Sequence, residues 1–366
     1  MWYNCCSQKQ MTALVYRDAI DWRFVLYIKH PESERGMDIK MKKVLKIIGI
    51  LLLCIIAFIV VLLIFLSKRQ FVAKDYSEKT ETGGTIEANY MKRGAYEVSY
   101  YEEPTMQGFE KYEIYYPTEL KSKDKKYPVV VFANGTGAKV SKYHALLEHM
   151  ASWGFIAIGT EEEYDWNGFA SEMCIRHLMK LNEIQTVNEK ENIFYDKVDF
   201  DNVGITGHSQ GGVGVISAIT ATEHKDIYKA AVALSPTNKE LAKNLEWEYD
   251  ATKVSTPIML LSGAGGGDDW VVTGEQLQDI YQDIDNRKVM MRRKNTPHGE
   301  MLYSADGYVT AWFMWHLQGD AEAAKAFVGD NPEIMDNEMY QDQQRDIKVI
   351  DSINVQKVNT LLKKPE

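Results

Sequence analysis

The most hydrophobic feature of the chain is an unbroken apolar run over residues 47–66, which contains no charged side chain. Its length matches the ~20 residues that a helix needs to cross a bilayer, and it lacks the polar face of a surface helix. Four lysines within residues 40–46 precede the run, whereas only Lys68 and Arg69 closely follow it. This bias predicts a cytoplasmic N-terminus and a body on the extracytoplasmic side of the cell membrane.

The same run is longer than the apolar core of a usual signal peptide, and no small-x-small cleavage site follows it. We therefore expect an uncleaved, single-pass signal anchor, although the sequence does not fix whether the anchor is cleaved. It also leaves open whether the chain starts at Met1, Met37 or Met41.

Beyond the run, the hydrophobic pattern changes to short strands that alternate with helices. Residues 96–101 and 112–116 alternate apolar and polar side chains and predict two early strands. Later strands are continuously apolar, as in buried parallel sheets. They are expected at 128–133, 155–159, 203–206, 230–234, 257–261 and 288–291. Helical spacing is found at 143–153, 171–187, 209–222, 274–284, 303–318 and 321–328.

This alternation predicts an α/β fold with a mostly parallel central sheet and helices on both faces. Residues 67–94 are polar and read as a linker, and the polar tail after residue 330 holds at most an edge strand at 346–350. The expected division is therefore a cytoplasmic segment 1–46, an anchor 47–66, a linker 67–94, a catalytic domain 95–330 and a tail 331–366.

Charge and cysteine content narrow the class of protein. Residues 1–69 hold 11 Lys and Arg against 5 Asp and Glu, whereas residues 70–366 hold 31 against 47. An acidic body argues against a nucleic-acid partner. Of the four cysteines, only Cys174 falls in the body, so no disulfide framework is expected there. No Cys/His cluster has zinc spacing, and we expect neither a metal nor a cofactor.

The strongest chemical signal is Gly207-His208-Ser209-Gln210-Gly211, which fits the nucleophile elbow G-x-S-x-G. The motif lies between a predicted strand and a predicted helix. A serine raised on such a sharp turn sits in strained backbone, and its close neighbours must lack a Cβ. The helix that follows directs its first N–H groups at the reacting carbonyl. Ser209 is therefore the candidate nucleophile.

In parallel sheets the turns at the carboxyl ends of the strands line one site. The turn after strand 128–133 is Asn134-Gly135-Thr136-Gly137, which lets a backbone N–H approach a substrate oxygen. Together with the N–H of Gln210, it is a candidate oxyanion hole. It fits neither the dinucleotide-binding glycine pattern nor a P-loop.

Two later turns supply an acid and a base. The turn after strand 257–261 contains Asp268 and Asp269, and either carboxylate is able to orient a histidine. The order Asp269-Trp270-Val271-Val272 places apolar residues between the acid and the next predicted helix, and this pattern favours Asp269 as the acid. Asp268 is the alternative. His298 is the only histidine in a loop after a late strand, which makes it the candidate base.

Aromatic side chains in the same turns are candidates for binding substrate. Tyr164 and Trp166 follow strand 155–159, and Trp270 follows the acid. They offer an apolar face to an acyl chain, a sugar or an aromatic ring, but ordinary surface packing explains them equally well.

Taken together, these motifs resemble the α/β-hydrolase family, in its cutinase-like polyester hydrolase, chlorophyllase-like and dienelactone hydrolase-like branch. The resemblance covers about residues 96–329, and its carriers are 129–137, 149–155, 204–212 and 311–317. It implies the chain order Ser…Asp…His, with Ser209 as nucleophile, His298 as base and an Asp after the seventh core strand. It also implies oxyanion donors at Gln210 and near Thr136. Asn134 departs from the pattern, since many relatives carry His there.

Together with the predicted anchor, the resemblance implies a membrane-anchored serine hydrolase. It is expected to cleave a small or polymeric carboxylic ester through a Ser-His-Asp triad and an acyl-enzyme intermediate. The same triad serves thioesterases, amidases, peptidases and acyltransferases, and a non-catalytic binding module on this scaffold also remains open. The acyl and alcohol groups of the substrate and the oligomeric state stay undetermined.

Overall fold

The computed structural model describes residues 39–105 and 109–347, and the chain divides after Lys68 into two units. In the first unit, the helix α1 (Ile39–Lys68) contains the apolar span Val44–Leu62, with a mean hydropathy of 3.2. By length and composition this span is a candidate membrane anchor or signal sequence. The expected cytoplasmic segment lies almost entirely outside the described residues.

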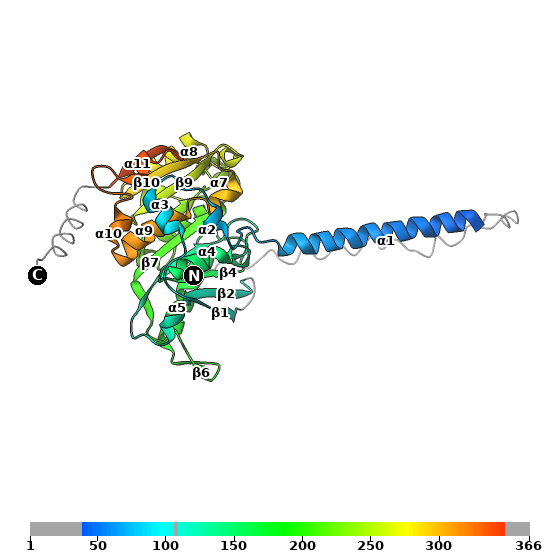
Figure 1. Cartoon of the computed structure of the whole chain (residues 1–366), viewed down its shortest axis with the longest axis horizontal. Coiled ribbons are helices and arrows are strands. Elements are labelled where there is room, and N and C mark those ends of the chain that lie inside the picture. The colour runs from blue at the N-terminus through cyan, green and yellow to red at the C-terminus, as the bar shows by residue number, and fades with distance from the viewer. Residues whose placement is uncertain (1–38, 106–108, 348–366) are drawn as a thin grey trace, which may run out of the picture. The chain divides into compact units, whose positions relative to one another are not determined.

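A nine-stranded sheet forms the centre of the second unit (Figure 1). Its order in space is β1-β2-β4-β3-β7-β8-β9-β10-β11. The strands from β4 to β10 are parallel to their neighbours, whereas β1, β2 and β11 pair antiparallel at the two edges. The bounds are β1 Val98–Pro104, β2 Lys111–Pro117, β3 Tyr127–Ala133, β4 Ile156–Thr160, β7 Val198–His208, β8 Tyr228–Leu234, β9 Ile258–Ala264, β10 Lys288–Lys294 and β11 Tyr340–Asp346. A separate hairpin joins β5 (Thr186–Val187) and β6 (Lys190–Glu191).

Helices cover both faces of this sheet, so the predicted α/β-hydrolase architecture is confirmed. The helices α4 and α9 pack on one face, with α3 against α9, while α5, α6 and α8 pack on the other. Their bounds are α3 Thr85–Met91, α4 His144–Ser152, α5 Phe169–Glu183, α6 Gln210–Ala221, α8 Gly274–Asp283 and α9 Asp306–Gln318. Shorter helices are α2 Tyr76–Lys79, α7 Lys239–Asn244, α10 Ala321–Ala324 and α11 Glu333–Asp336.

The stretch 67–94, expected to be a polar linker, is instead part of the second unit from Arg69 onward. Val72, Tyr76, Tyr90 and Met91 are buried in the hydrophobic core beneath α4 and α9. The carboxylate of Glu87 is also buried, 3.2 Å from the guanidinium of Arg293 on β10. This segment holds few apolar residues, and they are spread over two short helices and the chain before them, so the sequence shows no helical or strand periodicity there.

The tail beyond residue 330 also differs from expectation. The edge strand β11 ends at Asp346, where the predicted edge strand begins, and it pairs with β10. Residues 348–350 of the predicted strand lie outside the described residues. This strand consists mostly of polar residues such as Gln343 and Gln344, so the hydrophobic pattern does not predict it.

Candidate active site

Ser209 stands on the sharp turn between β7 and α6. Its backbone has φ 61° and ψ −120°, outside the regions that a side-chain-bearing residue favours, and its N–H donates to the carbonyl of Leu234 at 2.8 Å. A Cβ on Gly207 would lie 2.4 Å from the carbonyl oxygen of Gly211, and one on Gly211 would lie 2.2 Å from that of Ala133. The turn therefore closes only with glycine at both positions.

His298 and Asp268 form a close pair at the carboxyl ends of β10 and β9. The imidazole Nδ1 of His298 lies 2.6 Å from Oδ1 of Asp268. The Asp268 carboxylate is fully buried, and its other oxygen accepts from the Ser235 hydroxyl at 3.0 Å and from the Gly263 N–H at 2.5 Å. These donors fix the carboxylate, which in turn fixes the tautomer and orientation of the ring.

The preference for Asp269 over Asp268 disagrees with this geometry. Asp269 is half-exposed and binds the guanidinium of Arg292 at 2.5 Å, instead of His298. Both aspartates begin the 3₁₀-helix Asp268–Trp270, in which consecutive side chains point about 120° apart. Only one of them is therefore able to face His298, and that one is Asp268.

His208, inside the elbow, contacts the backbone of His298. Its Nε2 lies 2.8 Å from the backbone carbonyl of His298, and the two ring centroids are 4.4 Å apart. Burial lowers the pKa of His208 to about 3, so its ring is neutral. Because a carbonyl only accepts, Nε2 carries the proton, and the bond positions the turn that bears His298.

The predicted oxyanion residues both border the serine. Gln210 is the first residue of α6, so its backbone N–H has no acceptor within that helix. Thr136 lies in the loop after β3, and a Cβ on its neighbour Gly135 would come within 2.8 Å of the His208 carbonyl. The buried amide of Asn134 donates to the carbonyls of Thr160 and Glu162 at 2.8 and 2.6 Å, and thereby anchors this loop.

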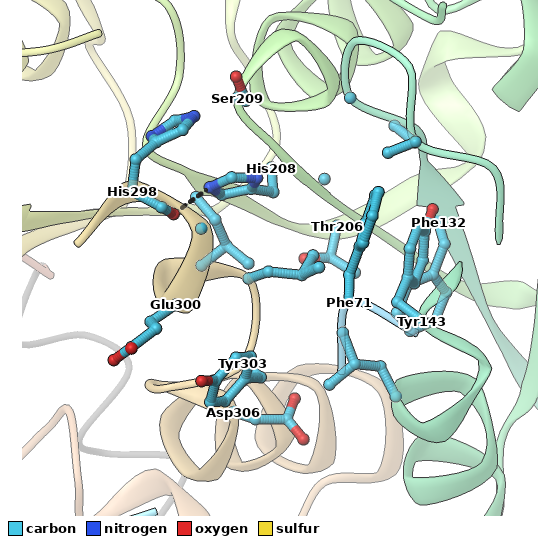
Figure 2. Close-up of a pocket in the computed structure, with 18 of the residues that line it drawn as sticks. Phe71, Phe132, Tyr143, Thr206, His208, Ser209, His298, Glu300, Tyr303 and Asp306 are labelled. Carbon is cyan, nitrogen blue, oxygen red and sulfur yellow. Dashed lines mark hydrogen bonds between the residues drawn. The ribbon is translucent and has the colours of Figure 1, made fainter. Parts of the chain in front are cut away.

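A cavity of about 630 Å³ opens beside these residues. Ser209 and His298 lie at one end of it, and Tyr303 and Asp306 lie at the other (Figure 2). Its size falls within the range of small-molecule sites. Apolar and aromatic side chains make up most of its walls, namely Phe71, Phe132, Tyr143, Leu146, Leu302 and Val309.

The three aromatic residues predicted to bind substrate do not line this cavity. Tyr164 is half-exposed, and Trp270 is 87% exposed. Trp166 lies in the same loop as Tyr164, next to the fully buried Asp165, whose N–H donates to the Gln210 side chain at 3.1 Å. Any contact they make with a substrate is outside the cavity.

The aromatic wall that sequence reasoning missed comes partly from Phe71, in the stretch interpreted as a linker, and partly from Phe132 and Tyr143. The two latter residues belong to predicted elements, but only the three-dimensional arrangement shows which of their faces borders the serine. Within residues 39–105 and 109–347, no three His, Cys, Asp or Glu side chains group in a way that would hold a metal ion.

The parallel sheet, the strained serine at its central turn and the neighbouring His–Asp pair define an α/β-hydrolase. Comparison with protein families agrees: residues 78–345 match the family described as PET hydrolase-like. The chain belongs to this family and is a carboxylic ester hydrolase of the serine type. A comparison with curated proteins gave no match.

Proposed function

We propose that the protein cleaves carboxylic esters through a triad of Ser209, His298 and Asp268. The observation that carries this proposal is the joint placement of the elbow serine and the Asp268-oriented histidine at one end of a single cavity. Figure 2 shows the His298 ring beside Ser209. Apo sites often hold such groups slightly apart and tighten only around substrate.

In the first half-reaction the Ser209 Oγ forms a bond to the ester carbonyl carbon, and His298 Nε2 takes the hydroxyl proton. The N–H groups of Gln210 and Thr136 stabilise the oxyanion, a contribution of about 3 kcal/mol per donor in comparable enzymes. The C–O bond to the alcohol then breaks, and His298 returns the proton to the departing alcohol. Asp268 stays ionised and stabilises the imidazolium.

In the second half-reaction a water molecule attacks the acyl-enzyme while His298 takes one of its protons. The bond to Ser209 breaks, the serine regains its proton, and the free acid leaves. No oxidant, metal or cofactor enters either step.

We also propose that α1 anchors this domain in the cell membrane, with the active site on the extracytoplasmic side. Its apolar span and the lysines before it support this topology. Protease treatment of intact cells should remove the domain; full protection would place it inside.

Hydrolysis of p-nitrophenyl butyrate by the full chain in detergent tests the proposed activity. We expect turnover by the wild type and loss of about 10⁴-fold or more in kcat for Ser209→Ala. No turnover by the wild type, or equal turnover by the variant, would refute the proposal.

A further inference from the structure

The chain immediately after α1 forms one wall of the catalytic cavity. Arg69, Gln70 and Phe71 all line it, and Phe71 lies between the side of the cavity that bears Thr206 and the side that bears Phe132 (Figure 2). The wall belongs entirely to the second unit of the chain.

This wall is fixed to the domain. The backbone N–H of Phe71 donates to the carbonyl of Lys142 at 2.7 Å, and the next residue, Val72, is 1% exposed. Four residues further on, Tyr76 is buried against the core and donates to the Asp306 carboxylate. The cavity is therefore complete only with the residues that leave the apolar helix.

Covalent connectivity alone then limits the distance from the cavity to the end of that helix. Phe71 is five residues beyond Leu66, where the apolar run ends. Even a fully extended chain spans at most ~3.6 Å per residue, which gives about 18 Å. The interfacial region of each leaflet is itself ~5–7 Å thick. With α1 in a bilayer, the chain is therefore too short to carry Phe71 more than about 11–13 Å beyond the lipid headgroups.

The apolar lining of the cavity suits the acyl chains of membrane lipids. Phe71 and Phe132 face a space that Leu146, Leu302 and Val309 also border, and the carboxylates of Glu300 and Asp306 line it away from Ser209. Apolar walls of this kind replace the hydrocarbon surroundings that an acyl chain loses when it leaves a bilayer, so its CH₂ groups need not enter water. The ester bond must lie at the Ser209 end, beside His298.

We propose, on the basis of the proposed esterase activity and membrane anchor, that the substrate is a long-chain acyl ester of a membrane lipid. Its acyl chain enters the Phe71-walled cavity from the adjacent leaflet. The Ser209 Oγ then forms a bond to the acyl carbonyl carbon as the C–O bond to the lipid alcohol breaks, and the alcohol takes the proton held by His298. Water releases the fatty acid from Ser209.

The test uses the full chain reconstituted in phosphatidylcholine vesicles that contain a phosphatidylcholine with a fluorescent long-chain acyl group. A twenty-residue (EAAAK)₄ spacer inserted between Leu66 and Ser67 moves the domain outward by ~30 Å where it is helical. We expect fatty-acid release from the vesicles to fall at least tenfold, while hydrolysis of p-nitrophenyl butyrate changes less than twofold. A Gly/Ser insertion of equal length between Asn188 and Glu189, in the hairpin turn between β5 and β6, is the control and should leave both activities unchanged.

A second variant tests the wall itself. Phe71→Ala should lower the ratio of kcat/KM for p-nitrophenyl dodecanoate to that for the butyrate about fivefold. Tyr195→Ala is the control and should leave the ratio unchanged. Tyr195 is an aromatic residue of similar exposure that lies just before β7, whereas Ser209 follows the other end of that strand.

Equal lipid hydrolysis with and without the spacer would overturn the entry of the acyl chain from the adjacent leaflet. Cleavage of the butyrate but no vesicle lipid by the wild type would overturn the lipid substrate. Both outcomes leave the esterase proposal standing. Absence of turnover on both esters would refute the esterase proposal, and the lipid substrate with it.

Discussion

Two His–Asp pairs border the same cavity, and only one of them is arranged for proton transfer. His298 Nδ1 lies 2.6 Å from Asp268, and His149 Nδ1 lies 2.8 Å from Asp306, at the far end of the cavity. The two pairs thus share a short distance from Nδ1 to a carboxylate oxygen, although only the contact between His298 and Asp268 has the geometry of a hydrogen bond. They differ in what the second ring nitrogen does.

In the buried pair, both nitrogens of His149 lie next to protein acceptors, and Nε2 is the one with hydrogen-bond geometry. Nε2 lies 2.9 Å from the carbonyl of Lys92, and the edge of the ring packs against Tyr76, with the ring centroids 6.0 Å apart. The His149 side chain is 4% exposed, whereas that of His298 is 27% exposed and borders the space next to Ser209. A carboxylate partner therefore orients a histidine, but access of Nε2 to a reacting atom decides whether it acts as a base.

Loss of each histidine gives the largest expected contrast. His298→Gln should lower kcat for p-nitrophenyl butyrate about 10⁴-fold, because the serine loses its proton acceptor. His149→Gln should change kcat less than threefold, since the ring touches neither Ser209 nor the ester. Stopped-flow or plate kinetics on folded protein give both values. A similar loss in both variants would remove the distinction between the two pairs.

The two neighbouring aspartates give the next contrast. Asp268→Asn should lower kcat about 10³–10⁴-fold, because the amide no longer stabilises the imidazolium. Asp269→Asn should keep kcat within threefold, since Asp269 binds Arg292 at the surface. Near-equal activities in the two variants would contradict the assignment of Asp268 as the acid.

Stability should show the opposite order from activity. His149→Gln removes one partner of a buried pair, and Asp306 then keeps only Tyr76 as a side-chain partner among the described residues. This loss should lower the free energy of unfolding by about 3 kcal/mol. His298→Gln should lower it by less than about 1 kcal/mol, because that ring is partly solvated and the buried Asp268 carboxylate keeps its hydrogen bonds from Ser235 and Gly263. Urea denaturation followed by tryptophan fluorescence measures both. A greater loss of stability in His298→Gln would show that the catalytic pair stabilises the fold more than the pair of His149 and Asp306 does.

The smallest expected effect is the pH dependence of the His149 contribution. Burial by itself lowers the pKa of His149, but Asp306 outweighs it, and the net result is a pKa above the ordinary 6.5. A raised folded-state pKa stabilises the protein fully below 6.5, and the stabilisation is lost as pH rises through the folded-state value. The difference in unfolding free energy between wild type and His149→Gln should therefore be larger at pH 6 than at pH 9. A difference that stays constant or grows with pH would show that the ring is neutral in the folded protein.

The sequence sufficed for the elements that carry strong periodicity. The valine-rich strand ending at Ala133 and the helix after Ser209 match their predicted bounds within about one residue. The strand before Ser209 is also predicted, because buried parallel strands are continuously apolar, but it begins at Val198, five residues before the predicted start. The elbow is recognisable from its glycines, which are required by close contacts within the turn and with the end of the neighbouring strand at Ala133.

Other parts of the site depend on side-chain orientations that the hydrophobic pattern of the sequence does not predict. Asp268 and Asp269 are adjacent, and only the phase of a 3₁₀-helix decides which one meets His298. Phe71 lies in a polar stretch and becomes a cavity wall through one backbone hydrogen bond, to Lys142. Tyr164, Trp166 and Trp270 follow the correct strands, yet their loops direct them away from the cavity. Long-range packing, not composition, determines each of these outcomes.

Covalent labelling tests the central claim, that Ser209 is a nucleophile activated by His298, most directly. An alkyl fluorophosphonate transfers its phosphonyl group to an activated serine oxygen as the P–F bond breaks, and peptide mass spectrometry locates the adduct. We expect a single adduct on Ser209, formed at least 100-fold more slowly in His298→Gln and at an unchanged rate in His149→Gln. An adduct on another serine, or equal rates in wild type and His298→Gln, would contradict the account.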